Sequence, residues 1–179
     1  VNYQHGGVMA CELRSWSEMY RDAFTEMQSD PVVMADLGGP FDRDASNDKF
    51  DRYRDAWDRD GVSRWVVADQ AGAFLGCAGV MKAGNPDHPL GVHYEIGWRF
   101  CHAAWGKGFA TASARRALEH AWTVIEANEI VSYTAPNNLR SQGVMARLKL
   151  KRDCDRDFTA RYPKGDWSGL VWVAERPIK

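Results

Sequence analysis

Residues 95–111 have the sequence EIGWRFCHAAWGKGFAT, and this stretch carries the strongest structural signal in the chain. Its first half alternates in character as a strand does. After a short connection, Gly106 and Gly108 stand one residue apart and open an apolar helical pattern. Glycine lets the backbone turn and leaves several N–H groups free to face one point. Because a helix N-terminus also has a favourable dipole, this junction is suited to bind an anion such as a phosphate.

The helix after the glycines is supported by the spacing of its apolar residues. They recur at intervals of three and four and predict one stripe that faces a core: Ala110, Ala114, Ala117, Leu118, Ala121, Trp122 and Ile125. The glycine turn itself matches neither common phosphate motif. The dinucleotide fingerprint needs a third glycine where Thr111 stands, and a P-loop needs Ser or Thr after its Gly-Lys pair. Taken alone, the junction fits a tight turn with ordinary helix packing as well as a phosphate site.

A second motif follows at residues 130–138. The run IVSYT at 130–134 is β-branched and aromatic, which is typical of a strand. The sequence APNN at 135–138 ends this strand, and Asn138 is a suitable N-cap. The helix that it would cap carries Ser141, Val144, Met145 and Leu148.

This succession of motifs resembles the acetyl-CoA-dependent GNAT acetyltransferases, and more narrowly their RimJ/RimL-like branch of ribosomal-protein N-terminal acetyltransferases. The resemblance runs from about Leu13 almost to the C-terminus. It implies an α/β domain with the GNAT fold, in which a central, mixed, mostly antiparallel and splayed β-sheet is flanked by helices. The matching stretches are EIGW at 95–98, WGKGFAT at 105–111, TAPNNLRS at 134–141, VM at 144–145 and SDPVVM at 29–34.

Length and composition agree with one domain over residues 1–179. A chain of 179 residues with 45% hydrophobic content is long enough to bury a real core. Residues 1–10 carry no pattern, and we expect them to be disordered or left over from cloning. The other expected elements are strands at 11–16, 63–68, 73–81, 151–158 and 168–174, a loop at 161–165, a helix at 17–28 capped by Ser17, a short helix after Pro31, and an amphipathic helix at 42–60.

Charge and cysteine usage narrow the classes of function. A net charge of −1 gives no electrostatic case for binding nucleic acid or an anionic membrane. No apolar run approaches a membrane span, and no N-terminal segment resembles an export signal. The four cysteines, which we expect to be small apolar fillers, are scattered without a Cys-x-x-Cys pair. This indicates reduced thiols in the cytoplasm and neither a disulfide framework nor a zinc site. We therefore expect a cytoplasmic protein, as monomer or homodimer, without a metal.

The resemblance implies that acetyl-CoA is the co-substrate. The backbone amides of 106–111 would hold the diphosphate, and the pantetheine arm would run beside 98–100 as an added strand does. A backbone N–H near Gly97 or Trp98 would then donate to the thioester oxygen. The residues expected to bind the cofactor are Trp98, Phe100, Trp105, Gly106, Lys107, Gly108, Phe109, Ala110, Thr111, Asn138 and Ser141.

Glu95 is the expected general base, acting directly or through a water molecule. Its position just before the splay of the sheet suits an ammonium group that approaches from the side opposite the cofactor. The alternative is a half-buried structural carboxylate that bonds a neighbouring strand or Arg99. His93, two residues earlier on the same face of the strand, is the reserve base.

The expected acid for the departing thiolate is Ser141. Many relatives carry a tyrosine seven residues after the asparagine, but this chain has Met145, which has no proton to donate. The alternative role for Ser141 is a hydrogen bond in the first turn of its helix. Two further departures from the family are Lys149, where a glycine is usual, and Trp172, where a tyrosine is common.

The expected activity is direct transfer of an acetyl group, in a ternary complex, to a primary amine on a small molecule or a peptide N-terminus. The eight tryptophans fit either an aromatic acceptor pocket or the hydrophobic core. From another class of function, the chain fits an acyl-CoA-binding module without transfer activity. A toxin that acetylates charged tRNA is a third possibility, but it would need a basic face that the composition does not indicate.

Overall fold

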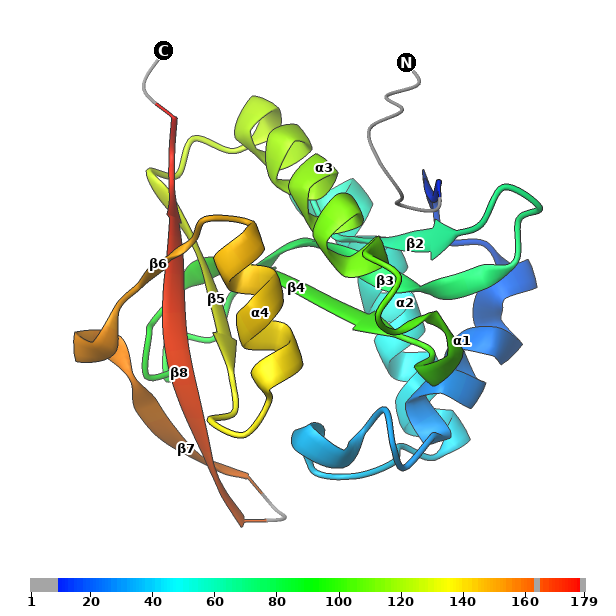
Figure 1. The fold of residues 1–179 in the computed structure, drawn as a ribbon, viewed down its shortest axis with the longest axis horizontal. Coiled ribbons are helices and arrows are strands. Elements are labelled where there is room, and N and C mark those ends of the chain that lie inside the picture. The colour runs from blue at the N-terminus through cyan, green and yellow to red at the C-terminus, as the bar shows by residue number, and fades with distance from the viewer. Residues whose placement is uncertain (1–9, 163–164, 178–179) are drawn as a thin grey trace.

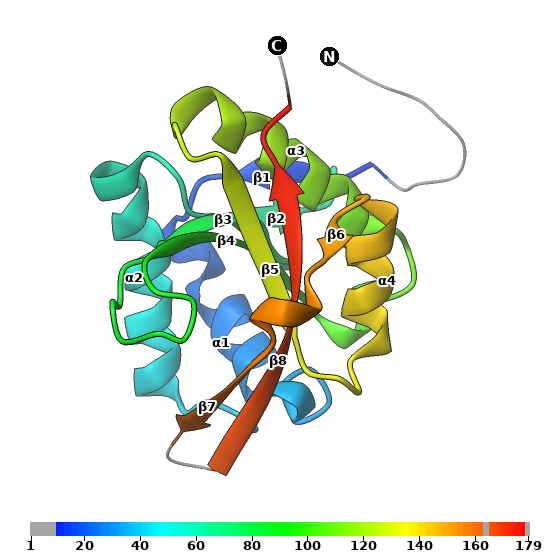
Figure 2. The same cartoon turned by 90° about the vertical axis from the view of Figure 1, so that its left-hand side faces the viewer.

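The computed structural model describes residues 10–162 and 165–177, which form a mixed sheet with helices on both faces (Figures 1 and 2). The strands are β1 (Glu12–Arg14), β2 (Arg64–Ala68), β3 (Phe74–Ala83), β4 (His93–Phe100), β5 (Glu129–Thr134), β6 (Lys151–Arg152), β7 (Phe158–Tyr162) and β8 (Gly165–Glu175). The α-helices are α1 (Arg21–Ser29), α2 (Arg43–Asp60), α3 (Phe109–Val124) and α4 (Leu139–Arg147). Single 3₁₀ turns are η1 (Glu18–Tyr20), η2 (Ala35–Leu37), η3 (His102–Ala104) and η4 (Cys154–Arg156).

The sheet has the strand order β1-β2-β3-β4-β5-β8-β6, and β7 pairs with β8. Among the described residues only β4 and β5 pair in parallel, so the sheet is mixed and mostly antiparallel. Helices α1 and α2 cover one face, and α3 and α4 lie on the other (Figures 1 and 2). The expected fold class is confirmed. None of the helices in the described part of the chain is long and apolar enough to cross a membrane.

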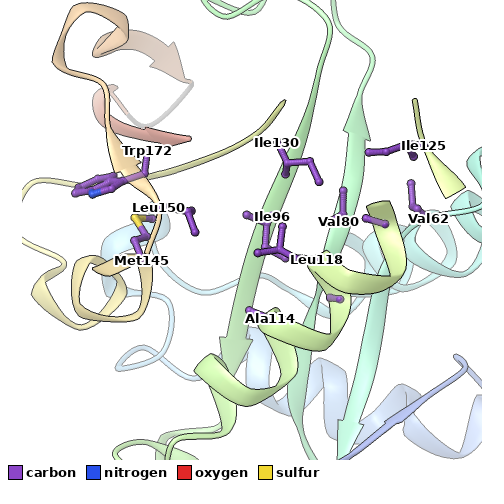
Figure 3. Close-up of a cluster of buried hydrophobic side chains, with 12 residues drawn as sticks. Val62, Val80, Ile96, Ala114, Leu118, Ile125, Ile130, Met145, Leu150 and Trp172 are labelled. Carbon is purple, nitrogen blue, oxygen red and sulfur yellow. The ribbon is translucent and has the colours of Figure 1, made fainter. Parts of the chain in front are cut away.

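The helices predicted at 42–60 and after the glycine turn are present. Asp42 caps α2 by accepting a hydrogen bond from the Ala45 backbone N–H at 2.8 Å, and Phe50 and Tyr53 are buried on its inner face. The predicted stripe of α3 faces the sheet, where Leu118 lies beside Ile96 in the main core (Figure 3). The stripe residues that are buried there are Ala114, Ala117, Leu118, Ala121 and Ile125.

The central strands part shortly after they meet. The ladder between β4 and β5 is confined to the pair Glu95 and Val131, and the Ser132 hydroxyl donates to the carbonyl of Ile96 at 2.9 Å. Beyond this point β4 and β5 diverge (Figure 1). The splay inferred from the family resemblance is therefore present, and it opens one edge of β4.

The strand predicted at 151–158 is wrong over most of its length. Only β6 and the first residue of β7 are extended there, and η4 lies between them. Arg156 donates to the carboxylate of Asp153 at 2.8 Å, and such local side-chain bonds favour a turn over an extended ladder. The closing hairpin is formed instead by β7 and β8, with Arg161 still in β7. Residues 163–164 of the predicted loop lie outside the described residues.

Three smaller predictions also need correction. The segment after Pro31 forms a turn and the 3₁₀ turn η2 instead of a helix, and it stops at Gly38, which has a φ of 84°. Ser17 precedes η1 but makes no capping hydrogen bond with its side chain. Cys154 is exposed rather than buried as a filler. The expectation for residues 1–10 lies outside the described residues, apart from Ala10.

Helix α4 ends as it would with a glycine. Lys149 has a φ of 60°, the left-handed region that favours glycine. The Leu150 N–H donates to the Met145 carbonyl at 3.1 Å, and the Lys149 N–H donates to the Ala146 carbonyl at 2.9 Å. These two bonds are those of a Schellman motif, so the helix keeps its usual ending despite the lysine.

Candidate active site

A groove of about 510 Å³ lies where α3 and α4 begin and β4 ends. It is bounded by the predicted turn, by the first turns of both helices, and by η2 on the other side. The predicted cofactor residues that line it are Trp98, Phe100, Trp105, Gly106, Gly108, Phe109, Ala110, Thr111, Asn138 and Ser141. Lys107 is the exception, because its side chain is exposed and does not line the groove. Most of the residues predicted from the sequence therefore lie on one continuous surface.

The glycine turn has the geometry that an oxyanion needs. Gly106 has a φ of 74°, and Gly108, the N-cap of α3, has a φ of 82°. A Cβ atom added at Gly106 would meet no atom within 4 Å, so the space in front of this backbone is open. Phe109, buried at 2% exposure, fixes the first turn of the helix beneath it. Bare amides at a helix N-terminus suit an anion such as a phosphate.

Two arginines that the sequence analysis did not single out also line the groove. Arg140 lies over the ring of Trp105 at 3.9 Å from its centroid, a cation–π contact. Arg147 donates from Nε to the Thr111 hydroxyl at 3.2 Å and ties α4 to α3. In the described part of the chain no carboxylate lies within salt-bridge distance of either arginine. The sequence did contain a signal for this pair: the two arginines are seven residues apart in one helix, which puts both on one face.

The backbone of Trp98 faces the opening between β4 and β5. The carbonyl of Ile96 is bonded from the β5 side by Ser132, whereas the N–H of Cys101 donates to Leu75 on β3 at 2.9 Å. Because N–H and C=O groups alternate sides along a strand, the groups of Trp98 point the same way as those of Ile96. The N–H of Gly97 points to β3. Of the two donors predicted for the thioester oxygen, Trp98 is the one that the opening exposes.

A smaller cavity of about 110 Å³ lies deeper in the splay. Asn138 and Ser141 line both this cavity and the groove, so the two spaces adjoin at the start of α4. Glu95 and Tyr133 line only the deeper one. The predicted base and the predicted cofactor groove therefore face one another across the splay, as an acceptor entering from the opposite side requires.

Glu95 is held by a partner that the sequence did not reveal. Its Oε2 lies 3.0 Å from Nη2 of Arg64, which is 7% exposed. Arg64, Gly79 and Gly97 are cross-strand neighbours, and a Cβ at Gly97 would lie 2.6 Å from Nη2. The arginine thus crosses the sheet where β3 and β4 carry no side chain. Burial lowers the pKa of Arg64. The carboxylate of Glu95 and other nearby groups raise this pKa by more, so Arg64 keeps its charge.

Arg99, one of the partners considered for Glu95 as a structural carboxylate, bonds elsewhere. Arg99 donates from Nη1 to Oε1 of Gln28 in α1 at 2.7 Å. The reserve base His93 has a defined partner as well: its Nδ1 lies 2.7 Å from the Gly91 carbonyl, which makes Nδ1 the donor. Its Nε2 then faces the hydroxyl of Tyr133 at 3.4 Å. Through Tyr133 this histidine reaches the deeper cavity.

The hydrogen bonds at the start of α4 bear on the two roles considered for Ser141, a proton donor to the thiolate or a hydrogen bond in the first turn. Asn138 Oδ1 accepts from the Ser141 backbone N–H at 3.1 Å, so the asparagine caps the helix as predicted. Among the described residues, the Ser141 hydroxyl itself makes no hydrogen bond within the protein and is available to a ligand. Met145 is 1% exposed and belongs to the main core. Met145 lines the deeper cavity but has no proton to donate.

Comparisons with known proteins identify the family of this chain. A family model described as an acetyltransferase (GNAT) domain matches residues 11–151. The chain is 28% identical to the uncharacterized protein YkkB of Bacillus subtilis over 89 residues, 49% of this chain and 50% of YkkB. It is 32% identical to the uncharacterized N-acetyltransferase YnaD of the same species, over 43% of this chain and 45% of YnaD. The chain thus spans about half the length of the curated relatives it matches.

Solved structures share the fold at low identity. An acetyltransferase from Agrobacterium tumefaciens has a TM-score of 0.75 at 21% identity, covering 98% of both chains. A spermidine N-acetyltransferase from Vibrio cholerae, in complex with CoA and spermine, has 0.71 at 15%, covering 93% of this chain and 95% of its own. The ribosomal L7/L12 acetyltransferase RimL has 0.72 at 15%, covering 94% of this chain and 92% of its own. At these identities the likeness concerns the fold.

Proposed function

Because the chain belongs to the GNAT acetyltransferase family, we propose that it transfers an acetyl group from acetyl-CoA to a primary amine in a ternary complex. One observation carries this proposal: the groove at the Gly106–Gly108 turn adjoins the cavity that holds Glu95, across the splay of β4 and β5. Such a passage lets an ester bound on one side meet an amine bound on the other.

The groove residues would hold acetyl-CoA by its phosphates and its arm. The amides of residues 106–111 suit the diphosphate, and Arg140 and Arg147 add positive charge beside them. The open edge of β4 would pair with the pantetheine arm as with an added strand. The Trp98 N–H would then stabilise the thioester oxygen, and the free amide nitrogen of the capping Asn138 would meet the arm.

Glu95 is the proposed base, acting directly or through water. The Arg64 ion pair supports this role because it holds the carboxylate in place where β4 and β5 part. The pair formed by His93 and Tyr133 is the second candidate, since the tyrosine lines the same cavity. Ser141, which lines both spaces, is the proposed proton donor to the leaving thiolate.

The acceptor is proposed to be a primary amine on a small molecule or a peptide N-terminus. Among the proteins of the same fold, one is a spermidine N-acetyltransferase and one a ribosomal-protein acetyltransferase. The four free thiols suit a reducing compartment, and we place the activity in the cytoplasm. The second candidate function is a non-catalytic acyl-CoA-binding module, favoured by the lack of a tyrosine at Met145.

The test is release of free CoA thiol from acetyl-CoA over a panel of primary amines and peptides. Amine-dependent release, with the acetylated amine identified by mass, supports the transferase. Acetyl-CoA binding by calorimetry without release for any amine would favour the binding module instead. A secondary amine series serves as the control, because transfer to a primary amine should exceed it.

A further inference from the structure

Two cations near the deeper cavity have no counter-charge. Arg99 lines both the groove and the cavity from the face of β4 that α1 and α2 cover. Lys49 reaches the same region from α2. In the described residues neither is within salt-bridge distance of a carboxylate. Arg64, by contrast, is neutralised by Glu95. The acceptor side of the splay therefore carries excess positive charge.

The hydrogen bonds of Arg99 are incomplete. One donor, Nη1, is bonded to Gln28, but Nε is buried without a hydrogen-bond partner. The Nε2 amide of Gln28, on a side chain that is 0% exposed, also lacks a partner. Buried donors are normally satisfied, and a guanidinium offers a fork that matches a carboxylate. These two donors are shielded from the cavity, but Arg99 itself lines it and has no carboxylate partner among the described residues, which favours an oxyanion as its ligand there.

Lys49 is the second cation, and it lies behind the residues that line the cavity. Its Nζ lies 4.9 Å from the ring centroid of Phe41 and 5.9 Å from that of Tyr53, which lines the cavity. Burial, and next the like charge of Arg99, lowers the pKa of Lys49 to about 7. A bound anion would be attracted to both cations, whereas a polycation would be repelled by them.

Building on the proposed transfer to an amine, we propose that the acceptor is a small amine that also carries a carboxylate, and that Arg99 binds this carboxylate with Lys49 behind it. The amine end would lie toward Glu95. Arg99 and Glu95 are four residues apart on one face of β4, so their Cα atoms are roughly 13 Å apart. Between them the guanidinium of Arg64 lies over Gly97 and is paired with Glu95.

The test compares amines in matched pairs that differ only by the carboxylate. The pairs are 4-aminobutyrate with propylamine, 6-aminohexanoate with pentylamine, and L-phenylalanine with 2-phenylethylamine; spermidine is the polycation. We expect the carboxylate member of at least one pair to have a kcat/KM about 10- to 100-fold higher, and spermidine to be poor. Equal rates within every pair, or a preference for spermidine, would overturn the inference while leaving amine transfer established.

Variants of Arg99 and Lys49 test whether these residues bind the acceptor carboxylate or only support the fold. Arg99→Gln should remove the preference by raising KM for the carboxylate member while leaving the uncharged member unchanged, and Arg99→Lys should restore part of it. Lys49→Met should weaken the preference in the same direction. Arg52→Gln, a matched loss of charge on the exposed face of α2, should leave it intact. An equal fall for both members in Arg99→Gln would mean that the arginine is only structural and would contradict the proposal.

The same pairs titrated by calorimetry, with CoA present, give a readout independent of turnover. Carboxylate binding that is lost in Arg99→Gln supports the inference even if no amine is acetylated, in which case only the proposed transfer fails. Binding without a preference for the carboxylate overturns the inference itself.

Discussion

The carboxylate of Glu95 and the guanidinium of Arg64 form an ion pair, with Oε2 and Nη2 3.0 Å apart, although the residues lie on strands separated by β3. The pair exists because Gly97 leaves room for the arginine to cross. It places a charged carboxylate where β4 and β5 part. Removing either partner alone leaves a largely buried charge unpaired, so activity and stability must be measured together.

Glu95→Gln should lower turnover at neutral pH and leave acetyl-CoA affinity nearly unchanged. Turnover should recover partly at higher pH, because more of the acceptor is then already neutral. The measurement is a pH–rate profile beside thermal unfolding, with the double variant Arg64→Met/Glu95→Gln as control for the unpaired charge. If Glu95→Gln keeps the full rate at every pH, Glu95 is not the base, and His93 with Tyr133, or water, takes that role.

Ser141→Ala should slow acetyl transfer by about 10- to 100-fold, the low end of general acid catalysis, because a thiol pKa of about 8.5 makes the leaving thiolate only moderately basic. Acetyl-CoA binding by calorimetry should change little. Gln142→Ala, one residue along α4, is the control variant. Normal turnover with weakened binding would instead make the Ser141 hydroxyl a cofactor ligand without an acid role.

Lys149→Gly should stabilise the protein by up to about 1 kcal/mol, because the residue has a φ of 60°. Urea unfolding gives the free energy of unfolding directly. Lys149→Ala is the matched control, since it removes the same side chain but keeps the strained φ, and it should bring no gain. Equal effects of the two substitutions would mean that the lysine side chain, and not the backbone, determines the stability here.

The stability of the fold should rise with pH because of Lys49. Burial lowers its pKa to about 7 in the folded chain, whereas an unfolded lysine titrates near about 10.4. Between these values the unfolded chain binds more protons, so this residue's contribution to folding stability increases with pH, by at most ~1.4 kcal/mol per pH unit.

Urea unfolding of the wild type and of Lys49→Met at several pH values between 7 and 10 tests this dependence. The Lys49→Met variant should show a shallower rise, and Lys82→Met, which removes an exposed lysine from β3, should keep the wild-type slope. Identical slopes for the wild type and Lys49→Met would refute the buried position of the ammonium.

The parts of the site that the sequence predicted are those encoded locally. The turn at Gly106 and Gly108 and the cap at Asn138 each depend on residues a few positions apart, and both are present. The Glu95–Arg64 pair was missed because it depends on the register of three strands, which no local pattern contains. The strand expected at 151–158 failed for a related reason: its charged side chains bond one another and fold the segment into a turn.

The most direct measurement is calorimetric titration of acetyl-CoA into the wild type, Gly106→Val and Gly91→Val. Gly106 and Gly91 both have positive φ, 74° and 62°, and a Cβ at either would meet no atom within 4 Å, so both substitutions impose a similar backbone strain. Only Gly106 lines the groove. We expect affinity at least about tenfold weaker for Gly106→Val, because the side chain fills the diphosphate space, and near wild-type affinity for Gly91→Val. Unchanged affinity in Gly106→Val would contradict the cofactor site and the function built on it.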